Sequence, residues 1–173
     1  LHINLHLDDR FIDILNSDYD LVIRVGQLED SSIVAQRIGN SHLVCCAAPC
    51  YLAKHGTPQT PEDLVKHNCL LYQHSVPMHI WHFQKDKVES HIAVHGDLAA
   101  NNGDVLCQAA ILGHGIVQQP DFITRNALAN GQLVQILSGY SSPLISAYAM
   151  YPTRHFLPMK IRRLIEFLQQ RLA

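Results

Sequence analysis

A chain of 173 residues, 47% hydrophobic and 16% charged, is long enough to bury a core and too apolar for an intrinsically disordered protein. Its formal net charge of −2 argues against a basic nucleic-acid surface, and its apolar runs are too short to span a membrane. Five cysteines without paired spacing argue against a secreted disulfide framework and favour the cytosol. Because Leu1 opens a strand pattern with no initiator Met and no signal peptide, we expect a piece of a longer protein.

The first elements follow a strand, helix, strand pattern. Apolar and polar residues alternate over residues 1–7, which predicts a strand with one buried face. A short helix capped by Asp8 or Asp9 is predicted next, ending near residues 16–18. The apolar run 21–25 then predicts a strand buried on both faces, so we expect a βαβ unit.

The rest of the chain alternates strands and helices. Residues 43–48 predict a buried strand, Pro49 begins a helix that ends at Gly56, and Thr60 caps a second short helix. Further strands are predicted over residues 70–72, 80–83, 88–94, 115–118, 133–137 and 145–151, and helices over 105–112, 122–129 and 161–172. This alternation predicts mostly parallel, helix-covered sheets that bind ligands beyond the carboxyl ends of their strands.

Five stretches stand out by their order and spacing rather than one by one. They are residues 9–15 (DRFIDIL), 20–26 (DLVIRVG), 43–52 (LVCCAAPCYL), 101–104 (NNGD) and 113–116 (GHGI). Together they resemble the effector-binding domain of LysR-type transcriptional regulators, from end to end of the chain. The resemblance implies an α/β fold of two Rossmann-like lobes, like type 2 periplasmic binding proteins.

The resemblance also implies how the chain is divided between the lobes. The chain is expected to cross twice, near residues 46–48 and 143–147. Lobe I then holds residues 1–47 and 146–173, and lobe II holds residues 48–145. Family members begin this domain with one more strand and helix, so a chain that starts at Leu1 would leave exposed strand edges in lobe I, which favour swapped dimers.

The function that the resemblance implies is sensing, not catalysis. A small-molecule effector, with a carboxylate as the first candidate, would bind between the lobes without a cofactor. The domain would form homodimers and the full-length cytoplasmic protein homotetramers, with DNA bound only by an N-terminal helix-turn-helix outside this chain. A solute-binding protein for transport is the alternative, and an export signal upstream would identify it.

The candidate ligand-binding residues lie where the expected strands end or helices begin. Asn101, Asn102 and Gly103 precede a helix whose free N–H groups could hold a carboxylate, with ordinary Asn capping as the alternative. Arg24 could bind an anion or pair with Asp20 or Asp30. The other candidates are Asp9, Ala48, Pro49, Gln118 and Pro120. Ala48 stands where relatives often have Ser, so the helix at Pro49 lacks a hydroxyl cap.

The twelve histidines and five cysteines suggest other kinds of site. His79 with His82, or His91 with His95, could bind a metal ion, but no compact ligand motif is present and we expect none to be bound. Cys45 and Cys46 fall in the expected crossover strand, where a thiol packs as a small apolar group. Cys50 or Cys107 could serve a thiol enzyme, although no local catalytic motif accompanies them.

Overall fold

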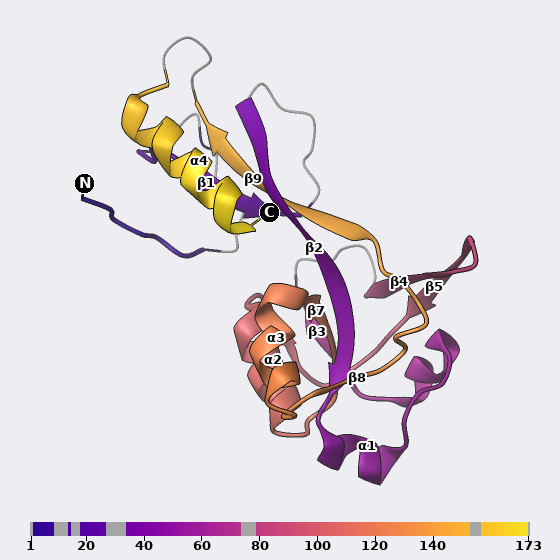
Figure 1. The fold of residues 1–173 in the computed structure, drawn as a ribbon. Helices are drawn as coiled ribbons and strands as arrows, with labels where there is room; N and C mark the ends of the chain where they lie inside the picture. The colour runs from indigo at the N-terminus through magenta and orange to yellow at the C-terminus, as the bar shows by residue number, and fades with distance from the viewer. Residues whose placement is uncertain are drawn as a thin grey trace. The chain divides into compact units, whose positions relative to one another are not determined.

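The computed structural model describes residues 2–8, 14, 18–26, 34–73, 79–152 and 157–172. The chain forms two compact units, which we call unit 1 (Leu1–Ser41 and Leu144–Ala173) and unit 2 (His42–Pro143). It therefore passes twice between two α/β units, as the predicted fold requires. The first boundary lies inside one unbroken strand, β2 (Val34–Ala47) (Figure 1). The lobe limits expected after residues 47 and 145 stay a prediction.

In the described part of unit 1, a small sheet packs against the C-terminal helix. Strand β1 (Val22–Val25) pairs antiparallel with β9 (Leu144–Tyr151), and β9 lies between β1 and β2. Helix α4 (Met159–Leu172), which the apolar repeat predicted, buries Ile161 and Ile165 in a cluster with Ile38 and Ala149. The contact is close, because a Cβ at Gly39 would lie 2.8 Å from the Cβ of Leu172.

Two predictions about unit 1 are wrong. Residues 2–8 form no strand, and Leu5 and Leu7 are about four-fifths exposed. A segment of alternating apolar and polar residues forms a strand only where a neighbouring strand offers free N–H and C=O groups. None of the described strands pairs with residues 2–8. The second strand exists as β1, but Ile23 and Val25 are exposed, and its neighbour β9 is antiparallel, so no βαβ unit is formed here. The helix predicted after Asp8 or Asp9 lies outside the described residues apart from Ile14.

Among the described strands of the unit 2 sheet, four run in the same direction and one, β2, is reversed. Strand β3 (Cys69–Tyr72) pairs in parallel with β7 (Ile116–Pro120) on one side and with β6 (Ala99–Ala100) on the other. The order β6-β3-β7 is the 2-1-3 order of doubly wound folds. Strand β2 runs antiparallel to β7, and β8 (Val134–Gln135) runs antiparallel to β2.

Short helices and a hairpin cover this sheet on both faces. Helices α2 (Gly103–Ile111) and α3 (Asp121–Ala129) lie side by side on one face (Figure 1). The other face carries α1 (Pro49–His55), the 3₁₀ helix η2 (Pro61–Lys66), and the antiparallel hairpin of β4 (Ile80–Lys85) and β5 (Val88–Ala93). These confirm the predicted helices and strands of unit 2, except that the strand predicted over residues 133–137 is only two residues long.

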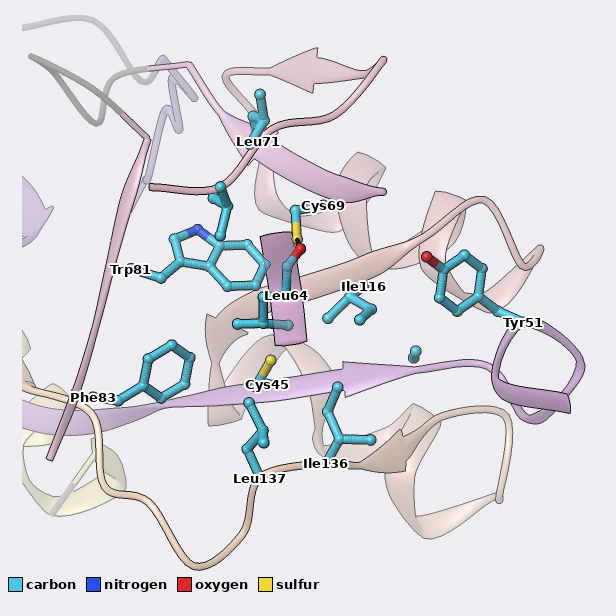
Figure 2. Close-up of a cluster of buried hydrophobic side chains, with 12 residues drawn as sticks. Cys45, Tyr51, Leu64, Cys69, Leu71, Trp81, Phe83, Ile116, Ile136 and Leu137 are labelled. Carbon is cyan, nitrogen blue, oxygen red and sulfur yellow. Dashed lines mark hydrogen bonds between the residues drawn. The ribbon is translucent and has the colours of Figure 1, made fainter. Parts of the chain in front are cut away.

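The carboxyl half of β2 shows why the sheet is buried on both faces. Its side chains alternate, so Cys45 and Ala47 enter one apolar cluster while Cys46 enters the other. The first cluster includes Trp81 and Phe83 from β4 (Figure 2). The buried strand predicted over residues 43–48 is therefore confirmed, and it separates the two apolar clusters of unit 2.

Candidate functional site

One edge of the unit 2 sheet brings together several of the predicted ligand-binding residues. Because β3, β6 and β7 are parallel, their carboxyl ends lie at the same edge. The register pairs Leu43 with Pro120, which places Leu43 of β2 at this edge as well. We call this the carboxyl edge and define it by six residues: Tyr72, Asn101, Asn102, Gly103, Gln118 and Pro120.

Helix α2 begins at the carboxyl edge with a capped first turn. The Oδ1 atom of Asn102 accepts a hydrogen bond from the N–H of Val105 at 3.0 Å, so the ordinary capping role is confirmed. The first N–H groups of a helix have no partner within it. Capping by Asn102 therefore leaves the N–H groups of Gly103 and Asp104 pointing from the positive end of the helix dipole.

Gly103 lets the end of β7 pack directly against the start of α2. A Cβ at Gly103 would lie 2.6 Å from Oε1 of Gln119 and 2.7 Å from Cδ1 of Ile123. Gln119 is buried, and the neighbouring Gln118 donates a hydrogen bond from Nε2 to Oγ of Ser142 at 3.3 Å. Gln119 lies within the predicted strand end at residues 118–120, whereas Ser142 was not predicted from the sequence.

The structure does not bring Ala48 and Pro49 to this edge. Strand β2 is antiparallel to β7, and the register pairs Ala47 with Ile116, so the residues after Ala47 lie at the opposite edge of the sheet. Ala48 is buried, precedes α1 and makes no side-chain cap, in line with the missing hydroxyl predicted there.

Arg24 and the acids expected near it belong to unit 1 or lie outside the described residues. Arg24 is half-buried on β1, where its register partner is Tyr148 on β9. Asp20 forms an ion pair with Lys160 at the start of α4, with 3.3 Å between Nζ and Oδ2. Asp9 and Asp30 lie outside the described residues.

The comparison with known proteins decides the family. The model of the LysR substrate binding domain matches residues 1–173, which is the whole chain. The chain belongs to this family. An uncharacterized HTH-type transcriptional regulator of Haemophilus influenzae is 36% identical over 161 residues, covering 93% of this chain and 56% of the relative. The chain thus spans little more than half the length of the curated relatives it matches.

Solved structures support the same assignment for this LysR-type domain. Full-length AphB, a Vibrio cholerae virulence activator of the LTTR family, superimposes with a TM-score of 0.83 at 29% identity, covering all of this chain and 59% of AphB. The regulatory domain of CrgA, a LysR-type transcriptional regulator from Neisseria meningitidis, gives a TM-score of 0.79 at 30% identity, covering 89% of this chain and 76% of that regulatory domain. The predicted fold of two periplasmic-binding-protein-like lobes is confirmed.

The described part of the LysR-type domain shows neither a membrane-spanning helix nor a group of metal-ligating side chains. No helix in the described part of the chain has the length and hydropathy needed to cross a bilayer. Within the same described ranges, no three His, Cys, Asp or Glu side chains are grouped as metal ligands. The histidine rings that meet are His82 and His91, rather than the pairs His79 with His82 or His91 with His95 suggested by spacing.

The cysteines of the LysR-type domain predict a simple pattern of thiol reactivity. All five are free, four are buried, and Cys50 is exposed. Burial raises the pKa of the Cys46 and Cys69 thiols to about 12, and it also raises the pKa of Cys45 and Cys107. Because the thiolate is the reactive form, we expect one thiol per native chain to react with the disulfide reagent DTNB, and all five after unfolding.

Cys50→Ser gives the control for this reactivity. The native variant is expected to show no rapidly reacting thiol, while unfolding still releases the four buried ones. A native wild-type chain with two or more fast thiols would contradict the assignment of Cys45, Cys46, Cys69 and Cys107 as packing groups. The same result would revive Cys107 as a nucleophile, a role that its buried position and raised pKa argue against.

Proposed function

We propose that this LysR-type domain senses a small anionic effector at the carboxyl edge of unit 2, with a carboxylate as the first candidate. The observation that carries the proposal is the start of α2 directly after β6, where Asn102 caps one N–H group and two others stay available. Such helix starts favour anions through their N–H groups and the helix dipole. Exposed Asn101 and Asn102 add amide donors beside them.

The proposed role extends to the longer protein. Curated relatives are HTH-type transcriptional regulators, which supports a domain that reports effector binding to a helix-turn-helix outside this chain. The domain would dimerise, the full-length protein would form tetramers in the cytoplasm, and the effector would shift the balance between their arrangements. A coupling of about 1–3 kcal/mol is enough for such a switch. The relatives favour regulation over transport or catalysis.

A thermal-shift screen of small aliphatic and aromatic carboxylates tests the sensing function. A ligand at one hundred times its Kd stabilises the native state by about 2.7 kcal/mol. For a chain of this size, that corresponds to a rise in Tm of roughly 5–10 °C. Flat melting curves across the whole set would contradict a carboxylate effector. A positive hit then allows the position of the site to be tested.

Asn102→Asp separates capping from ligand binding. Asp is as good a cap as Asn, so we expect the Tm of the free variant to stay within about 2 °C of wild type. The added negative charge would stand beside the proposed carboxylate, so the Kd of the hit is expected to rise at least about tenfold, corresponding to about 1.4 kcal/mol. Isothermal titration calorimetry measures this change.

Asn126→Asp is the matched control. It makes the same substitution at an exposed position of α3, far along the helix from its start at the carboxyl edge. This variant is expected to bind the hit with wild-type affinity. If both Asp variants weaken binding equally, net charge explains the effect. If neither does, the effector binds away from the start of α2.

A further inference from the structure

The β4–β5 hairpin has one buried and one exposed face. Trp81 and Phe83 point into the core of unit 2 (Figure 2), where both are almost completely buried. Side chains alternate along a strand, so His82 between them lies on the solvent side. His91 on β5 is the direct register partner of His82, and both imidazoles are exposed. Two metal-ligating side chains from different strands therefore share one exposed surface.

The two imidazoles point the same kind of atom at each other. The Nδ1 atoms of His82 and His91 are 2.6 Å apart, and the rings meet edge to face at 79° with 4.7 Å between centroids. Two ring nitrogens at this distance would repel through their lone pairs unless a positive species lies between them. A proton shared in a hydrogen bond between the two Nδ1 atoms removes this repulsion. A metal ion bound by both Nδ1 atoms removes it as well.

Glu89 lies on the other side of the His91 ring. Its Oε2 atom is 3.7 Å from Nε2 of His91, on the same strand two residues away. Histidine ligands of metals commonly donate their second N–H to a carboxylate, which fixes the tautomer and the ring orientation. The 3.7 Å contact is too long for a hydrogen bond, but the Glu89 carboxylate attracts a proton at Nε2, and that tautomer leaves the Nδ1 lone pair of His91 free to face His82.

The turn of the hairpin fixes this geometry. Asp86 and Lys87 both have positive φ, 50° and 68°, as a two-residue turn of type I′ requires. That turn sets the register, and the register sets His82 opposite His91. The hairpin backbone therefore fixes which residue faces His82. The burial of Trp81 and Phe83 fixes which face of β4 His82 lies on.

We propose that His82 and His91 form a two-imidazole binding site for a divalent transition-metal ion of the Ni²⁺ and Cu²⁺ class. Imidazole suits these ions, which favour square-planar or tetragonal coordination with neighbouring ligands at about 90°. With metal–nitrogen bonds of about 2.0–2.1 Å, adjacent square-planar positions place the nitrogens about 2.9 Å apart, whereas tetrahedral coordination needs about 3.3 Å. The observed Nδ1–Nδ1 distance of 2.6 Å is closer to the square-planar value than to the tetrahedral one. The rings would therefore move less to bind an ion of the square-planar class.

The rest of the coordination sphere belongs to water. Among the described residues, no third His, Cys, Asp or Glu side chain is grouped with the pair as a metal ligand. The ion would therefore bind reversibly and link β4 to β5 on their exposed side. This two-stranded sheet would be stabilised locally, because a ligand that binds only the paired strands opposes their separation.

Ni²⁺ is the probe for the test, because Cu²⁺ would oxidise the exposed Cys50 thiol. Calorimetric titration of the whole chain is expected to show one principal Ni²⁺ site. His82→Asn and His91→Asn are each expected to weaken it at least tenfold, and the double variant no further than either single one, because the site needs both rings. His114→Asn, in the exposed loop between α2 and β7, is expected to leave the affinity unchanged.

Hydrogen exchange gives a second readout that binding elsewhere would not produce. Saturating Ni²⁺ is expected to slow exchange of the β4 and β5 amides in wild type and to leave both single variants unchanged. Each variant is compared with its own metal-free state, so a general loss of stability does not imitate the effect. Wild-type Ni²⁺ affinity in both His→Asn variants, no Ni²⁺ binding by the wild type, or binding without slower hairpin exchange would overturn the proposal.

Discussion

Replacing Gly96 with alanine is expected to prevent unit 2 from folding stably. A Cβ at this position would collide with the carbonyl oxygen of Cys69 and lie 2.8 Å from its carbonyl carbon and 3.0 Å from Oδ1 of Asn68. These are backbone and hydrogen-bonded atoms at the start of β3, where Cys69 N donates to His95 O at 3.0 Å. Neither the Gly96 loop nor the start of β3 can move away without breaking the sheet. The free energy of unfolding is therefore expected to fall by more than about 4 kcal/mol.

Urea unfolding measures this loss. Trp81 is the single tryptophan and is buried in unit 2, so its fluorescence reports on this unit directly. Gly139→Ala is the matched control, because a Cβ there meets nothing within 4 Å. That variant is expected to stay within about 1 kcal/mol of wild type. Equal unfolding midpoints for the two variants would show that the loop before β6 does not lie against β3 as described.

Local signals explain which elements could be predicted from the sequence. Helix α1 begins at Pro49 and ends at Gly56, and η2 begins after Thr60, whose capping box with Asp63 is formed. These signals act within a few residues and do not depend on the rest of the chain. Residues 2–8 carry an equally clear alternation, yet a strand also needs a partner that only the fold can supply.

The candidate site was predicted only in part, for the same reason. Asn101 to Gly103 follow β6 and Gln118 to Pro120 end β7, and because both strands are parallel to β3, their common edge follows from the predicted fold. Ala48 and Pro49 also follow a strand, but that strand is reversed, and no local pattern in residues 43–48 records its direction. The His82–His91 pair depends on hairpin register, which sequence spacing between histidines does not show.

Asn68 lies where three segments of unit 2 meet at the edge opposite the candidate site. Its Nδ2 group donates to Oδ1 of Asp97 and to the carbonyl of His114, both at 2.7 Å, and its Oδ1 accepts from the N–H of Asp97 at 3.0 Å. The side chain thereby joins the start of β3 to the loops before β6 and β7. These three hydrogen bonds, of which one is accepted by the Asp97 carboxylate and one by the His114 carbonyl, stabilise unit 2 by about 2–3 kcal/mol.

Asn68→Asp is therefore expected to be more damaging than Asn68→Ala, although Asp has almost the shape of Asn. Alanine removes the three bonds, whereas an ionised Asp would also point an acceptor at the Asp97 carboxylate and the His114 carbonyl. We expect losses of about 2–3 kcal/mol for alanine and about 3–5 kcal/mol for aspartate at pH 7, measured by urea unfolding.

The pH dependence of the two variants distinguishes repulsion from simple loss of bonds. The neighbouring Asp97 would raise the pKa of a carboxyl at position 68 in the folded state, so the extra penalty is present above that pKa. As the pH falls through this pKa, protonation of the carboxyl at position 68 restores one hydrogen-bond donor and removes the repulsion. The difference in unfolding free energy between the aspartate and alanine variants is then expected to disappear. An aspartate variant as stable as wild type at pH 7 would show that the Nδ2 bonds of Asn68 do not hold the loops, and that backbone pairing such as Ile116 N to Asn68 O does so alone.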